Sequence, residues 1–236
     1  MKQRLRNIGD NRKIDRCLFC NRYNVELTRE HTPSKILLDE PLPENLPITY
    51  TCKDCNSSFS IDEEYFACIL EASKCHSIWL DDLVRFKVRR TLQKNKELYK
   101  TIANSFDQET KRFSFDLKRL KHIAIKLAIC HLAFEMDEIV NNNPNYFDFF
   151  LRDEVNDRKI EDFDTLIEIS VICEISKCYE NMIILESSQD TRLFYAWQIV
   201  QEGQYRYMCA FSDDKYIVRI VIGEYTFFEM HWDCIN

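Results

Sequence analysis

Two Cys-x-x-Cys pairs near the N-terminus are the residues with the clearest chemical potential in this chain. The first pair is Cys17 and Cys20, and the second is Cys52 and Cys55. A two-residue spacer lets a tight turn aim both thiolates at one metal ion, and four thiolates complete the tetrahedral coordination of zinc. Because a closed coordination sphere leaves no position for water, this spacing predicts a structural zinc site.

The segment between the pairs is longer than a simple zinc ribbon needs, and it contains further polar groups. Glu30 and His31 precede Pro33, Asn45 precedes a leucine, and Asn56 directly follows the second cysteine pair. Histidine suits general-base chemistry because its unperturbed pKa lies near neutrality. Carboxylate and amide oxygens suit a hard divalent ion. An acid beside a histidine in a loop is also typical of a surface ion pair, so these two residues alone do not establish a site.

The order of these motifs resembles that of the HNH endonucleases, the ββα-metal nuclease superfamily, in the branch with a four-cysteine zinc. The resemblance covers about residues 14–75. It implies that His31 is the general base and that Asn45 holds the loop bearing it. It also implies that Glu30 and Asn56 are ligands of a catalytic Mg²⁺ or Mn²⁺. The chain departs from the family in having Glu30 where aspartate is common and Asn56 in place of the final histidine.

The resemblance implies an enzyme that hydrolyses phosphodiester bonds of DNA and leaves 5′-phosphate and 3′-hydroxyl ends, in bacterial defence or a mobile element. Two alternatives remain open. One is a non-catalytic zinc-knuckle protein that binds nucleic acid or a protein partner. The other is a nuclease that stays inactive until its C-terminal part senses a ligand, a regulatory partner or a second copy of the chain.

Composition favours an ordinary globular protein of 236 residues, with 45% hydrophobic and 30% charged residues. No apolar run approaches the roughly 20 residues that span a bilayer, and the N-terminus lacks the apolar core of a signal peptide. These features predict a cytoplasmic protein without a membrane segment. Seven of the 11 cysteines lie outside the two pairs among apolar neighbours, and we expect them to be reduced residues of the core.

The net charge of −7 is unevenly distributed. Residues 1–35 carry a local charge of +5 and residues 80–121 carry +6, which leaves −18 on the remainder. Two basic stretches on an acidic body suit contact with a polyanion on one face. Helices with solvated lysine and arginine faces would give the same pattern, so charge alone does not distinguish these readings.

The periodicity of apolar residues predicts an α+β fold in two parts. The resemblance implies that residues 1–75 form a zinc-pinned, treble-clef-like nuclease module, and the periodicity predicts a helical and antiparallel β accessory domain over residues 76–236. Short strands are expected over 23–27 and 48–51, and a helix is expected after Asn56 with Ser60 to Glu63 as its capping box. Further helices are expected over 77–100 and 117–140, followed by strands over 166–173, 182–185, 194–200, 205–211, 216–222 and 226–232.

Overall fold

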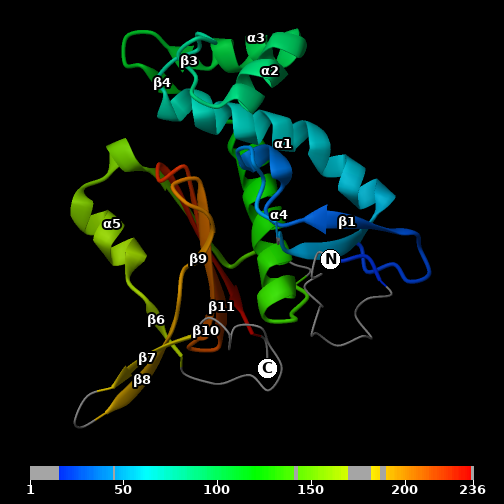
Figure 1. The fold of residues 1–236 in the computed structure, drawn as a ribbon, viewed down its shortest axis with the longest axis vertical. Helices are drawn as coiled ribbons and strands as arrows, with labels where there is room; N and C mark the ends of the chain where they lie inside the picture. Colours follow the sequence, from blue (N-terminus) through cyan, green and yellow to red (C-terminus); the bar gives the residue numbers. More distant parts are fainter. Residues whose placement is uncertain (1–15, 45, 141–142, 170–181, 187–189, 235–236) are drawn as a thin grey trace.

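An antiparallel pair of strands leads directly into a long helix at the N-terminal end of the chain (Figure 1). The computed structural model describes residues 16–44, 46–140, 143–169, 182–186 and 190–234. Strand β1 (Leu27–His31) pairs with β2 (Ile48–Cys52), and helix α1 (Lys53–Lys74) follows without a break. A short 3₁₀ helix, η2 (Lys35–Leu37), lies in the connection between the strands.

Two sequence predictions about this unit are wrong in their boundaries. The strand expected over 23–27 begins only at Leu27, since Tyr23 forms an isolated bridge with Arg16 and the chain bends at residues 24–25. Helix α1 begins at Lys53 with Cys52 as its N-cap, and Ser60 lies inside the helix, where its hydroxyl donates to the Ser57 carbonyl at 2.9 Å. The capping-box pattern therefore does not mark the start of the helix.

The middle of the chain is helical, with more interruptions than the periodicity predicts. The expected helix over 77–100 is two helices, α2 (Phe86–Lys94) and α3 (Lys96–Asn104), because Asn95 leaves helical geometry and caps α3 through its side chain. Helix α4 (Leu117–Glu135) ends before residue 140. A small hairpin of β3 (Phe106–Asp107) and β4 (Arg112–Phe113) separates α3 from α4. Within the described ranges, no helix combines the length and apolar character needed to cross a membrane.

The predicted antiparallel sheet in the C-terminal part is confirmed. Five strands lie in the order β5-β12-β11-β10-β9, and three more form a smaller sheet in the order β6-β8-β7. The strand expected over 194–200 is interrupted and belongs to both sheets, and the second half of the one expected over 166–173 lies outside the described residues. The strands are β5 (Tyr146–Leu151), β6 (Ile167–Glu168), β7 (Met182–Glu186), β8 (Thr191–Tyr195), β9 (Gln198–Gln201), β10 (Tyr205–Ser212), β11 (Lys215–Ile222) and β12 (Thr226–Asp233).

The five-stranded sheet lies between α4 on one face and the short helix α5 (Asp157–Asp164) on the other (Figure 1). Apolar side chains of β12 pack on both faces of the sheet, because successive side chains of a strand point in opposite directions. Phe227 packs against Phe163 of α5, and Phe228 stacks on Phe66 of α1 with ring centroids 5.7 Å apart. The larger core is continuous from Leu18 in the first cysteine turn to Trp232 in β12.

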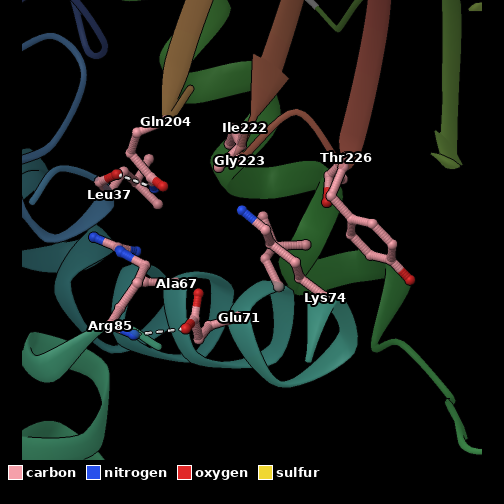
Figure 2. A pocket seen from close by; sticks show the side chains of 11 residues that line it. Leu37, Ala67, Glu71, Lys74, Arg85, Gln204, Ile222, Gly223 and Thr226 are labelled. Carbon is pink, nitrogen blue, oxygen red and sulfur yellow. Dashed lines mark hydrogen bonds between the residues drawn. The ribbon is translucent and has the colours of Figure 1, made fainter. Parts of the chain in front are cut away.

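The N-terminal unit and the sheet also meet through polar contacts at one end of β10. Gln204 donates from its side chain to the Leu37 carbonyl at 2.8 Å, and both groups are drawn at the seam in Figure 2. The hollow at this seam is only about 10 Å³, which is about the volume accessible to one water molecule. The division of the chain at residues 75 and 76 remains a prediction.

Candidate metal centre and adjoining pocket

The structure brings the four paired cysteines together. The sulfur atoms of Cys17, Cys20, Cys52 and Cys55 all lie within 4.8 Å of one another. A tetrahedral zinc with Zn–S bonds of about 2.3 Å separates its sulfurs by about 3.8 Å, and the Cys20 and Cys52 sulfurs are 3.8 Å apart. The predicted convergence is confirmed, and the donor set fits a zinc ion that would be fully enclosed by thiolates.

Local backbone geometry explains why the cysteines converge. Asn21 adopts a positive φ of 55°, and its N–H donates to the Cys17 carbonyl at 3.0 Å, which closes the first cysteine turn. Leu18 N–H donates to the Tyr50 carbonyl of β2 at 3.1 Å and so fixes this turn against the strand that carries the second pair. The first turn of α1 then places Cys55 beside Cys52.

Arg22 provides a positive group at the edge of the cluster. Its Nε donates to Cys20 at 3.2 Å, and its Nη2 donates to Cys52 at 3.3 Å and to Asp54 at 2.9 Å. The Arg22 guanidinium lowers the pKa of Cys20 to about 6. Zinc binds thiolates and not thiols, so this contact favours the metal-binding form of Cys20.

The remaining cysteines agree in part with the expected core role. Cys68, Cys130 and Cys209 are buried and unlinked by disulfides, whereas Cys75 and Cys234 are only half-buried. Burial raises the pKa of the Cys68 thiol to about 12, which keeps it protonated and inert. The expectations for Cys173 and Cys178 lie outside the described residues.

Glu30, His31 and Asn56 line one open pocket of about 360 Å³ beside the cysteine cluster. Glu30 and His31 come from the end of β1, and Asn56 comes from the first turns of α1. These three residues lie close together because β2 pairs with β1 and continues directly into α1. The start of the helix therefore lies next to β1. The other lining residues are Arg29, Ser34, Lys35, Ile36, Ser60, Glu63 and Glu64.

His31 is half-buried at the end of β1, opposite Ile48. Its pKa is lowered, first by burial and then by the positive charges of Lys35 and Arg29. The imidazole is therefore neutral at neutral pH and can accept a proton. Lys35 and Arg29 are themselves exposed at the pocket and provide positive charge to an incoming anion.

Glu30 has a partner that the sequence did not reveal. Glu30 is only 6% exposed, and its carboxylate accepts a hydrogen bond from the Lys126 ammonium of α4 at 2.5 Å. Lys126 also donates to the Glu63 carboxylate and, at 3.1 Å, to the Ser34 hydroxyl. Burial raises the pKa of Glu30, and the Lys126 charge offsets part of that effect.

A two-step hydrogen-bond chain orients the amide of Asn56. The Thr28 hydroxyl donates to the Thr51 carbonyl at 3.0 Å, so its oxygen must accept the bond from Asn56 Nδ2, also at 3.0 Å. A hydroxyl has only one proton, and this fixes which end of the amide faces Thr28. The amide oxygen of Asn56 is thereby left for another ligand, the role that a metal-binding asparagine requires.

Two expectations about the catalytic site, the role of Asn45 and a second metal centre, are not borne out by the described residues as a convergence of side chains. Asn45 lies outside the described residues, so its suggested role remains a prediction. Among the described residues, the four cysteines are the only group of three or more histidine, cysteine or acidic side chains whose ligand atoms converge within 4.8 Å. Glu30, His31 and Glu63 share the pocket but do not form such a group, so the geometry gives no second metal centre of that kind.

Sequence reasoning missed Lys126, Glu63 and Thr28. One signal was available for Lys126. It lies three residues after Ile123 and four before Cys130, in the apolar stripe of the helix, where a lysine must be buried or snorkel. Glu63 gave no such signal, because a glutamate on the helix surface is ordinary.

Comparison of the chain with models of known protein families, with curated proteins and with solved structures gives no match.

Proposed function

We propose that the protein is a metal-dependent endonuclease of the HNH type that hydrolyses phosphodiester bonds of DNA. The observation that carries this proposal is that Glu30, His31 and Asn56 line one shared pocket, at the junction of a strand pair and a helix beside a four-cysteine cluster. The two sets of residues were singled out from the sequence independently of their positions in space. Their proximity is what the ββα-metal arrangement requires.

In the proposed reaction, His31 accepts the proton of the attacking water, for which its neutral form at neutral pH is suited. Glu30 and Asn56, with oxygen ligands facing the pocket, would hold Mg²⁺ or Mn²⁺. When bound, the ion would neutralise charge on the phosphorane-like transition state and on the leaving oxygen. Arg29 and Lys35 would attract the phosphate backbone, and the pocket is open to solvent, so a polymer can enter it.

One observation favours the alternative of a non-catalytic zinc-knuckle protein that binds nucleic acid or a partner. The Glu30 carboxylate is already paired with Lys126, so its charge is neutralised without a divalent ion. Under this alternative only the zinc cluster binds metal, and His31 has no chemical role. The two proposals differ in whether a second metal site exists.

Plasmid cleavage by the full-length, zinc-loaded protein tests the proposal. We expect nicked or linear product with Mg²⁺ or Mn²⁺ and none without added divalent ion or with EDTA. End-labelling should show 5′-phosphate and 3′-hydroxyl termini. The test variant is His31→Ala, and its matched control is His76→Asn. His76 is an exposed histidine just after the end of α1, and asparagine tolerates its positive φ of 49°. No cleavage by a folded, zinc-loaded protein would favour the binding alternative.

A further inference from the structure

Lys126 is a buried cation placed between two carboxylates of the proposed active site. Its side chain is 2% exposed, and it contacts Glu30, Glu63 and Ser34. An ammonium group has three N–H donors, and these three acceptors use all of them. The lysine therefore has no donor left for a substrate phosphate.

The three partners of Lys126 line the pocket, whereas Lys126 itself does not. The ammonium thus reaches the carboxylates from the side of α4 and the core. Its ion pairs with the Glu30 and Glu63 carboxylates offset the cost of burying the ammonium group. The lysine remains charged, and any influence on chemistry must pass through Glu30 and Glu63.

The fixed charge of Lys126 changes what this pair of carboxylates can bind. Two carboxylates alone would present a charge of −2 to a cation, and the ammonium reduces it to −1. Affinity for a hard divalent ion depends on the charge of its ligands, and a cation held against the same oxygens repels a second one. Arg29 and Lys35 add positive charge to the wall of the pocket, and only Glu64 adds a further negative charge.

We propose that Lys126 is a positioning residue that makes divalent-ion binding at Glu30 and Glu63 conditional on a nucleic-acid phosphate. Without DNA the site attracts the ion weakly. A phosphate drawn to Arg29 and Lys35 adds the missing negative charge, and the ion then binds between substrate and protein. This inference rests on the proposed nuclease function and identifies Glu63 as part of the site.

The test is Mn²⁺ binding measured by titration calorimetry on full-length, zinc-loaded protein. The His31→Ala background keeps a short DNA duplex intact, and each protein is titrated with and without that duplex. Lys126→Met should raise the Mn²⁺ affinity without DNA by about tenfold or more, and Glu63→Gln should lower it by a similar factor. The double variant restores the net charge of −1 and should return to within about threefold of the parent.

The double variant separates charge from structure, because a purely structural role for Lys126 would not be rescued by removing a second charge. Glu63→Gln keeps an acceptor for Lys126 and remains informative if Lys126→Met does not fold. Mn²⁺ binding that requires DNA but is indifferent to Glu63→Gln, or is not tightened in a folded Lys126→Met, overturns this inference alone. Absence of Mn²⁺ binding in all proteins, with or without DNA, together with absence of cleavage by the wild type, overturns the proposed function.

Discussion

His31 sits where its chemistry can be controlled by its neighbours. It lies next to Glu30 on β1, but its imidazole responds most to burial and then to the positive charges of Lys35 and Arg29. All three influences disfavour the protonated ring. A general base is active in its neutral form, so these neighbours extend the active range toward acid.

The pH dependence of cleavage should reflect this shift. Because the pKa of His31 is lowered from 6.5, the rate should rise with pH through an inflection below 6.5 and be level through neutrality. The measurement is the single-turnover rate of plasmid cleavage from pH 5 to 8. An inflection above 6.5 that persists in His31→Ala would contradict this assignment.

His131 makes a second prediction at the residue scale, concerning stability. It is fully buried in α4, stacks on Tyr207 with ring centroids 3.6 Å apart, and shares a 2.8 Å hydrogen bond with Tyr205. Burial lowers its pKa to about 3. The unfolded chain takes up a proton near pH 6.5 and the folded chain does not, so stability is full above 6.5 and falls as pH drops toward 3.

The unfolding free energy should therefore decrease by roughly 1.4 kcal/mol per pH unit from this group below pH 6. Denaturant unfolding of wild type and His131→Gln between pH 7 and 4 measures the effect. The variant should show a shallower dependence on pH, and equal slopes would show that His131 does not contribute.

At the residue scale, sequence reasoning identified the four cysteines and the three residues that share the pocket. All of them lie between residues 17 and 56, and the pairing of β1 with β2 and the start of α1 bring them together. Lys126 is 96 residues from Glu30, so no local pattern connects the two. The apolar residues around Lys126 in the sequence indicate that this lysine is buried. They do not indicate which acid it pairs with, because that depends on how α4 packs.

At the scale of elements, the cysteine cluster is the part that organises the strand pair and the start of α1. It joins the turn before β1 to the end of β2 and to the first turn of the helix. A two-stranded pair has little stability in water without further support. Residue preferences misplaced β1 and the capping-box pattern misplaced the start of α1, because neither takes account of the convergence of the cysteines at these boundaries.

Loss of the metal should destabilise the β1–β2 pair and the start of α1 before the rest of the chain. Cys52→Ser should reduce bound zinc from one ion per chain to a trace and lower the thermal midpoint by about 10 °C or more. Zinc content by atomic absorption and thermal unfolding by circular dichroism measure both effects. Cys234→Ser is the matched control and should retain zinc. An unchanged zinc content in Cys52→Ser would exclude this cluster as the zinc site.

At the scale of the whole molecule, α1 connects the proposed nuclease site to the C-terminal sheet. Its first turns carry Cys55 and Asn56, and its middle contributes Phe66, which is fully buried against Phe228 of β12. The helices and the sheet were predictable from periodicity. Their mutual packing was not, because apolar spacing says which face of an element is buried but not what covers it.

Because the larger core is continuous, the chain should unfold in a single transition although its sequence divides into two parts. Phe66→Ala should lower the unfolding free energy by about 3–5 kcal/mol and shift the whole transition. Ile61→Ala is the control on the same helix, since Ile61 is 74% exposed. Two transitions, with only one shifted by Phe66→Ala, would instead support independent folding of residues 1–75.

The central claim is that His31 acts as a base beside a divalent ion in the pocket, and the cleavage rate of His31→Ala tests it most directly. At saturating Mn²⁺ with the plasmid, we predict a loss of about 10²–10⁴-fold relative to wild type, with zinc content and thermal midpoint unchanged. His76→Asn should cut at the wild-type rate. Equal rates for wild type and His31→Ala, or no cutting by either protein, would contradict the claim.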